Sequence, residues 1–167
     1  SITADGATYQ AVEFCGDAID HMGIDGRFTL SNMAVEMGTK AALIAPDETA
    51  ITYARARATR QFTPEYPDNN AEYSKTMDFN VSNLSPYVAK PHNVDNGVPI
   101  EEVLGTLINQ ANLTSCTAGR IDDLRAAAKV LKGRKIAPGV RLLVVPASRE
   151  VYRKALLPGS ASFASID

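Results

Sequence analysis

Residues 106–157 have the sequence TLINQANLTSCTAGRIDDLRAAAKVLKGRKIAPGVRLLVVPASREVYRKALL, and this stretch decides the fold. We predict a strand over 106–114, a tight loop at 116–119, a helix over 121–132, a strand over 140–145 and a helix from Ser148 to about Leu157. The apolar residues of the first helix share one face: Ile121, Leu124, Ala127, Ala128 and Leu131. A βαβα order implies a right-handed crossover and a parallel sheet covered by helices, so the fold class is α/β.

The first third of the sequence has the same alternation of elements. We predict a strand from about Tyr9 to Phe14, a helix over 26–37 that Gly38 ends, a strand over 41–45, and a helix from the cap Asp47 to about Arg60. Prolines and asparagines then punctuate the chain, with one weak alternating strand predicted over 77–81. We expect two subdomains, 1–84 and 100–167, joined by a connector over 85–99.

Composition excludes several classes of protein. Hydrophobic residues make up 45% of the 167 residues, too many for a disordered chain, and two cysteines cannot form a disulfide scaffold. The net charge of −2 provides no basic surface for nucleic acid, and no apolar run is long enough to span a membrane. The chain begins at Ser1 without a signal peptide, which indicates a piece of a longer protein, and we expect a cytoplasmic location.

Cys116 is the most informative single residue. It follows a predicted parallel strand and precedes a helix, at the edge where open α/β sheets bind ligands. A helix N-terminus favours the thiolate, so Cys116 is a nucleophile, a metal or cluster ligand, or an inert buried thiol. A nucleophile is disfavoured because the two histidines, His21 and His92, lie in distant segments. Cys15 is interpreted as a structural thiol.

Three polar side chains are further candidates. Asn32 and Glu36 are four residues apart and share one helix face, where an amide and a carboxylate can bind a hydroxyl or a water. The spacing alone favours a solvated polar face. Arg120, beside the cysteine loop, is a candidate for binding a substrate carboxylate or for a structural ion pair. The three arginines of the 47–60 helix are interpreted as a solvated edge: Arg55, Arg57 and Arg60.

Three stretches, in this order and spacing, resemble the aconitase superfamily and within it the large subunits of 3-isopropylmalate dehydratases. They are DGATY running into EFCGDAI (5–19), DGRFTLSNMAVEMG followed by LIAPDE (25–48), and SCTAGRIDDLR continuing to LKGRK and VVPASR (115–149). The segment VPASR (145–149) is most similar to an archaeal-type branch that also includes homoaconitases and dimethylmalate dehydratases. The resemblance extends from residue 3 to about 156.

The resemblance implies aconitase-like α/β/α three-layer subdomains with a mainly parallel sheet. It also implies a hydro-lyase that reversibly dehydrates 3-isopropylmalate in leucine biosynthesis, with a [4Fe–4S] cluster held by three cysteines. By position, Cys116 matches the first cluster cysteine, Asn32 the asparagine near the cluster, and Glu36 the carboxylate near the iron-bound hydroxyl. The implied partners are a small subunit carrying a swivelling domain and a small 2-hydroxy di- or tricarboxylic acid, with no nucleic acid and no membrane.

The sequence departs from the family pattern at two points. The family's other two cysteines follow the VPAS segment as a CxxC pair, which this sequence does not contain, and Ala118 stands where the family usually has asparagine. We therefore expect a fragment that is inactive alone and binds no stable cluster by itself. The alternatives are a homoaconitase or dimethylmalate dehydratase large subunit, or a non-catalytic α/β module used for binding or subunit docking.

Overall fold

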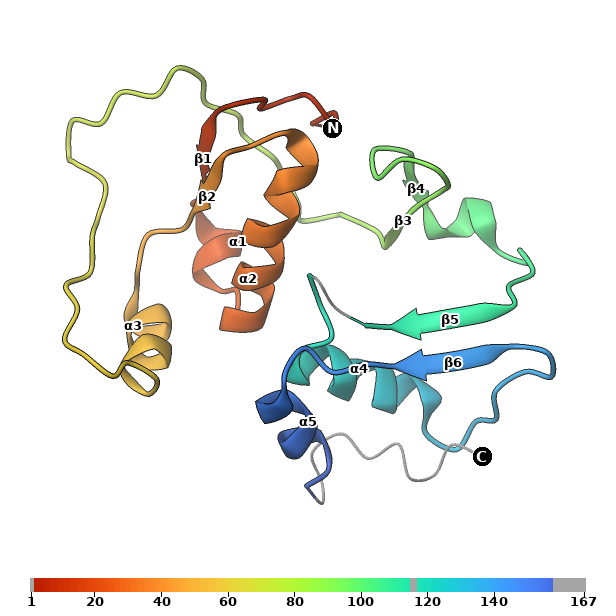
Figure 1. The fold of residues 1–167 in the computed structure, drawn as a ribbon. Helices are drawn as coiled ribbons and strands as arrows, with labels where there is room; N and C mark the ends of the chain where they lie inside the picture. Colours follow the sequence, from red (N-terminus) through yellow and green to blue (C-terminus); the bar gives the residue numbers. More distant parts are fainter. Residues whose placement is uncertain (1, 115–116, 158–167) are drawn as a thin grey trace. The chain divides into compact units, whose positions relative to one another are not determined.

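The computed structural model describes residues 2–114 and 117–157, which divide into two compact units, Ser1–Leu104 and Gly105–Asp167 (Figure 1). The first unit contains β1 (Ala11–Glu13), α1 (Asp17–Asp20), α2 (Ile24–Met33), η1 (Ala34–Met37), β2 (Ala41–Leu43), α3 (Glu48–Arg55), β3 (Tyr87–Ala89), β4 (Gly97–Pro99) and η2 (Ile100–Val103). The second contains β5 (Gln110–Leu113), α4 (Ile121–Leu131), β6 (Arg141–Val144) and α5 (Arg149–Ala155).

The second unit confirms the predicted βαβα order. β5 and β6 are parallel, with Gln110 opposite Arg141 and Leu113 opposite Val144, and α4 connects them. Leu124 of α4 is fully buried, as the predicted apolar face requires. The Ser148 side chain caps α5 by accepting a hydrogen bond from the Val151 amide at 3.1 Å. The strand predicted over 106–114 is shorter than expected because its partner β6 has only four residues, which pair with 110–113.

The first unit begins with a second parallel strand pair. β1 and β2 pair with Ala11 opposite Ala41, and α1, α2 and η1 lie between them in the chain. The predicted 26–37 helix is present as α2 followed by the 3₁₀ turn η1, and it ends at Gly38 in the left-handed conformation, with φ of 79°. A Cβ at Gly38 would lie 2.8 Å from the Thr8 hydroxyl, so this close approach also requires glycine.

A buried arginine holds the helices of the first unit together. Arg27 is only 5% exposed, and its guanidinium donates to the carbonyls of Met22 at 2.8 Å and Asp20 at 3.2 Å. It also donates to Asp47 Oδ2 at 2.6 Å, while Asp47 Oδ1 accepts from the Ala50 amide and so caps α3. This one side chain of α2 therefore joins the end of α1 and the turn before α2 to the start of α3.

This arrangement predicts a loss of stability at low pH. The hydrogen bond from Arg27, followed by that from the Ala50 amide, lowers the pKa of Asp47 from 3.8 to about 2. Because the folded state binds the proton less tightly, the stabilisation is complete above pH 3.8 and is lost as the pH falls toward about 2. Asp47 is 42% exposed, so the loss should stay below about 1 kcal/mol. Urea unfolding across this window measures it, and Asp47→Asn should abolish this component.

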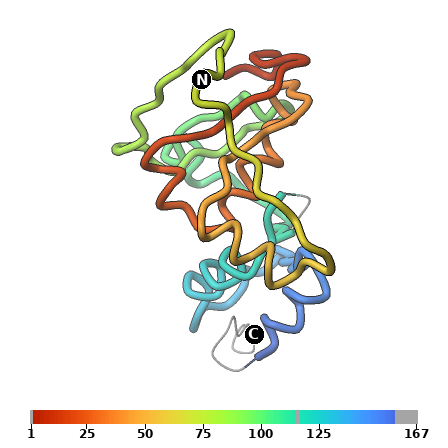
Figure 2. The backbone as a smooth tube through the Cα atoms, turned by 90° about the vertical axis from the view of Figure 1, so that its left-hand side faces the viewer, coloured from red at the N-terminus to blue at the C-terminus, as the bar shows by residue number. Residues whose placement is uncertain are grey.

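The middle of the chain differs from the predictions. Residues 56–86, all of which the structure describes, contain no helix or strand, so the strand predicted over 77–81 is wrong and α3 ends before Arg60 (Figures 1 and 2). Within the described residues, the alternating apolar side chains of 77–81 have no partner strand to pair with. The segment 85–99, expected to be a connector, instead contains the antiparallel pair β3–β4, with Val88 opposite Val98. In the described ranges, no helix is long and apolar enough to cross a membrane.

Candidate functional site

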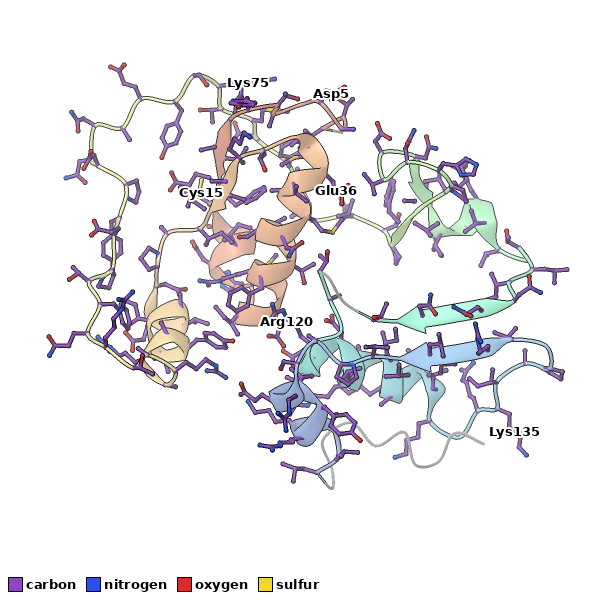
Figure 3. The ribbon with its side chains drawn as sticks, viewed as in Figure 1. Asp5, Cys15, Glu36, Lys75, Arg120 and Lys135 are labelled. Carbon is purple, nitrogen blue, oxygen red and sulfur yellow. The ribbon has the colours of Figure 1, made fainter. Side chains whose placement is uncertain are left out.

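Asn32 and Glu36 lie on consecutive helical segments of the first unit. Asn32 is in the last turn of α2 and Glu36 is in η1, where Figure 3 labels it. Both side chains are exposed, while Ala34 between them is only 2% exposed and anchors the turn. A 3₁₀ turn winds more tightly than an α-helix, so the two side chains are less closely aligned than four residues on one straight α-helix would be.

Two exposed apolar residues lie close in sequence to Glu36. Met33 is 47% exposed and Val35 is 61% exposed, so two large hydrophobic side chains lie close in sequence to the two polar candidates. A solvated polar face would carry polar residues at these positions. Isolated apolar side chains are common on protein surfaces, so these two do not by themselves indicate a binding surface.

The loop before α4 carries the candidates of the second unit. The Ala147 amide, which follows β6, donates to the Gly119 carbonyl at 2.9 Å, so the loops after both parallel strands meet at their carboxyl edge. Gly119 is buried with φ of 78°, and Ala118 beside it is half-buried. This is the edge at which open α/β sheets bind ligands.

Arg120 stands at the start of α4 (Figure 3). Its side chain is half-buried, and its amide donates to Asp123 Oδ2 at 3.0 Å, which caps the helix. Asp123 therefore acts on the backbone of the helix, as expected for an acidic residue in a first turn. Cys116 falls in sequence between β5 and α4 and lies outside the described residues.

Cys15 and its surroundings were not fully anticipated. Cys15 is exposed and forms no disulfide within the described part of the chain. Two residues earlier, Glu13 accepts a hydrogen bond from the Tyr73 hydroxyl, which raises the pKa of Tyr73. This contact attaches the segment 56–86 to β1 across 60 residues of sequence, and no local pattern could have predicted it.

The cysteines of this sequence do not fit a complete iron–sulfur site. A cluster with three protein thiolates needs three cysteines, whereas the sequence has two, at positions 15 and 116, in different units. Among the residues that the structure describes, no three His, Cys, Asp or Glu side chains are grouped to hold a metal ion. These residues can therefore supply only part of such a ligand set.

Comparison with known proteins gives a consistent result. A family model described as Aconitase family (aconitate hydratase) matches residues 1–107 and 102–162. The chain is 50% identical to a probable 3-isopropylmalate dehydratase large subunit of Methanothermobacter thermautotrophicus and 46% identical to a 3-isopropylmalate dehydratase large subunit of Methanopyrus kandleri. It is 48% identical to a probable methanogen homoaconitase large subunit of Methanothermobacter thermautotrophicus. Each alignment covers 95% of this chain, which spans only 37–38% of the length of these relatives.

Proposed function

The chain belongs to the aconitase family, and from this membership we propose that it forms part of the large subunit of a hydro-lyase acting on 3-isopropylmalate in leucine biosynthesis. The observation that carries the proposal is the similarity to large subunits of that name over 95% of the chain. The parallel strand pairs and their covering helices support the aconitase-like α/β fold. Since the chain spans 38% of these relatives, the activity would belong to a protein of their length.

Two side chains would act on the substrate hydroxyl. The Glu36 carboxylate is exposed and can accept a hydrogen bond from a hydroxyl or transfer a proton at its oxygen. The Asn32 amide can orient the same group from the preceding turn. Arg120 would bind a substrate carboxylate, because a half-buried guanidinium suits bidentate recognition. The roles of Asn32 and Glu36 follow from positions at which the sequence resembles the family, whereas that of Arg120 rests only on its place beside the cysteine loop.

The proposed activity also needs a cofactor, a partner subunit and a substrate. A protein of full length would hold a [4Fe–4S] cluster with Cys116 as one ligand, and that cluster would supply Lewis-acid chemistry. The partner would be a small subunit with a swivelling domain, and the substrate a small 2-hydroxy di- or tricarboxylic acid. The location would be cytoplasmic.

A homoaconitase is the second candidate, because the relative with that name is 48% identical, close to the 50% of the first. A dimethylmalate dehydratase belongs to the same branch. The experiment co-expresses the complete reading frame containing this sequence with its small subunit, adds iron and sulfide anaerobically, and compares turnover of the three hydroxy acids. Preferential turnover of 3-isopropylmalate supports the proposal. Turnover of another acid transfers the assignment to that activity.

A non-catalytic binding or docking module is favoured by one observation. Ala118 replaces the asparagine usual for the family, directly beside the buried Gly119 at the carboxyl edge of the sheet. Failure of the assembled complex to turn over any of the three acids, despite a full cluster content, would support this module and contradict the hydro-lyase proposal.

The cysteine count gives a separate prediction. After anaerobic reconstitution, the 167-residue chain alone should retain iron well below one cluster per chain, because two of its own thiolates cannot replace three. Iron analysis and the visible absorbance of the cluster measure this. A stoichiometric, stable [4Fe–4S] signal from this chain would contradict the expectation, and Cys15→Ser would test whether the exposed thiol had been recruited.

A further inference from the structure

An open hollow of about 670 Å³ lies where α3 ends and the segment 56–86 begins. Its lining residues are Arg55, Ala58, Thr59, Arg60, Gln61, Phe62, Thr63 and Pro64. The two arginines, expected to form a solvated helix edge, therefore contribute to one concave surface. The volume lies within the range of small-ligand sites.

The charges of this hollow favour an anion. None of its lining residues is acidic. The nearest acid on α3 is Glu48, whose Oε1 accepts from the Thr52 hydroxyl at 3.0 Å and lies 3.9 Å from Arg55, with both charged groups largely exposed. Within the part of the chain that the structure describes, Arg60 has no ion-pair partner. The C-terminal dipole of α3 contributes only about −0.5 charge against the full charges of the arginines.

A neighbouring arginine, Arg57, packs on the last turn of α3. The Arg57 guanidinium stacks 3.7 Å from the Tyr53 ring centroid and donates to the Tyr53 carbonyl at 3.2 Å. Tyr53 in turn packs edge-to-face on Phe28 of α2, with ring centroids 5.3 Å apart. Arg57 thus adds a third positive charge close in sequence to Arg55 and Arg60, and the Tyr53–Phe28 contact attaches the end of α3 to α2.

We propose that this hollow binds a small organic oxyanion, with the forks of Arg55 and Arg60 on its phosphate or carboxylate groups. Planar guanidinium groups match both kinds of oxyanion through paired hydrogen bonds. The hydroxyls of Thr59 and Thr63 add neutral donors, and Phe62, 43% exposed, provides an apolar wall for the carbon part of the ligand. The site lies wholly in the first unit, so it does not depend on the hydro-lyase assignment.

The test follows the backbone amides of residues 55–63 by NMR in the full chain, during titration with pyrophosphate and with citrate at constant ionic strength. We expect the amide chemical shifts of these residues to change and saturate with pyrophosphate or citrate. Chloride added at the same concentration of negative charge should not produce these changes. Stronger binding of pyrophosphate identifies a phosphate ligand, and stronger binding of citrate a polycarboxylate. Shifts no larger than those with chloride would overturn the proposal.

Variants separate a built site from general charge attraction. Arg60→Gln and Arg55→Gln should each weaken binding about tenfold, while Arg60→Lys, which keeps the charge and loses the fork, should fall between them and the wild type. The matched control is Arg125→Gln, which removes an exposed arginine of α4 paired with Asp122 at 3.0 Å. If Arg125→Gln weakens binding as much as Arg60→Gln, the ligand responds to net charge only and the proposal is wrong.

Discussion

Replacing Glu36 with glutamine should lower kcat of the assembled complex by about 10²–10⁴-fold, the usual contribution of a residue that transfers a proton. Glutamine has nearly the same shape but cannot accept the proton from a hydroxyl group. Because Glu36 is exposed on η1, the substitution should leave the fold intact. Steady-state kinetics of the cluster-loaded complex measure kcat, and circular dichroism checks the fold.

The control for this experiment is Glu102→Gln, which removes another exposed carboxylate, from the 3₁₀ turn η2. Its kcat should match that of the wild type. Asn32→Ala should raise KM, or lower kcat by a smaller factor than Glu36→Gln does, since an orienting amide does not transfer a proton. An unchanged kcat in Glu36→Gln would return this residue to a solvated surface and remove the main support for the proposed role of α2 and η1.

Replacing Arg27 with methionine should destabilise the first unit by about 3 kcal/mol. Methionine fills a similar volume but removes every donor, so the carbonyls of Asp20 and Met22 lose their partner and Asp47 loses its ion pair. The effect exceeds that of protonating Asp47, because a neutral carboxyl group can still accept from Arg27. Urea unfolding monitored by far-ultraviolet circular dichroism measures the change in midpoint.

Arg125→Met is the matched control for Arg27→Met. Arg125 is 48% exposed and pairs with a 66% exposed Asp122, so its loss should cost less than about 1 kcal/mol. Equal destabilisation by both substitutions would mean that burial of Arg27 contributes nothing. Arg27→Lys should lie between wild type and Arg27→Met, because lysine keeps the charge but cannot reach three acceptors in a fixed fork.

The sequence predicted those elements whose ends and faces are set locally. α4 begins and ends within a residue of the prediction because its apolar face and its flanking glycines agree. Asp47 and Ser148 were recognised as caps because a short polar side chain before a helix satisfies an amide of the first turn. The β3–β4 pair was missed because each strand has three residues and only one facing pair of valines.

Part of the candidate site could be predicted from the sequence. Asn32 and Glu36 were found by their spacing and by resemblance, and both lie on the predicted helical segment. Arg27 and Tyr73 were not singled out, because a charged or aromatic residue carries no local sign that it will contact a residue 20 or 60 positions away. Asp47 offered a signal for a contact of this kind. A carboxylate that caps a helix with one oxygen has a second oxygen that can accept a hydrogen bond from another side chain, here Arg27.

The number of buried side chains is small compared with the number of residues that the chain shares with its relatives. Among the described residues, the buried hydrophobic side chains are Ala7, Ile19, Ala34 and Leu124, joined by the charged Arg27. Two relatives share 50% and 46% of their aligned residues with this chain. The identical positions therefore outnumber the buried ones many times over, and most of them lie on side chains that this chain, spanning 38% of the relatives' length, leaves exposed or half-buried by itself.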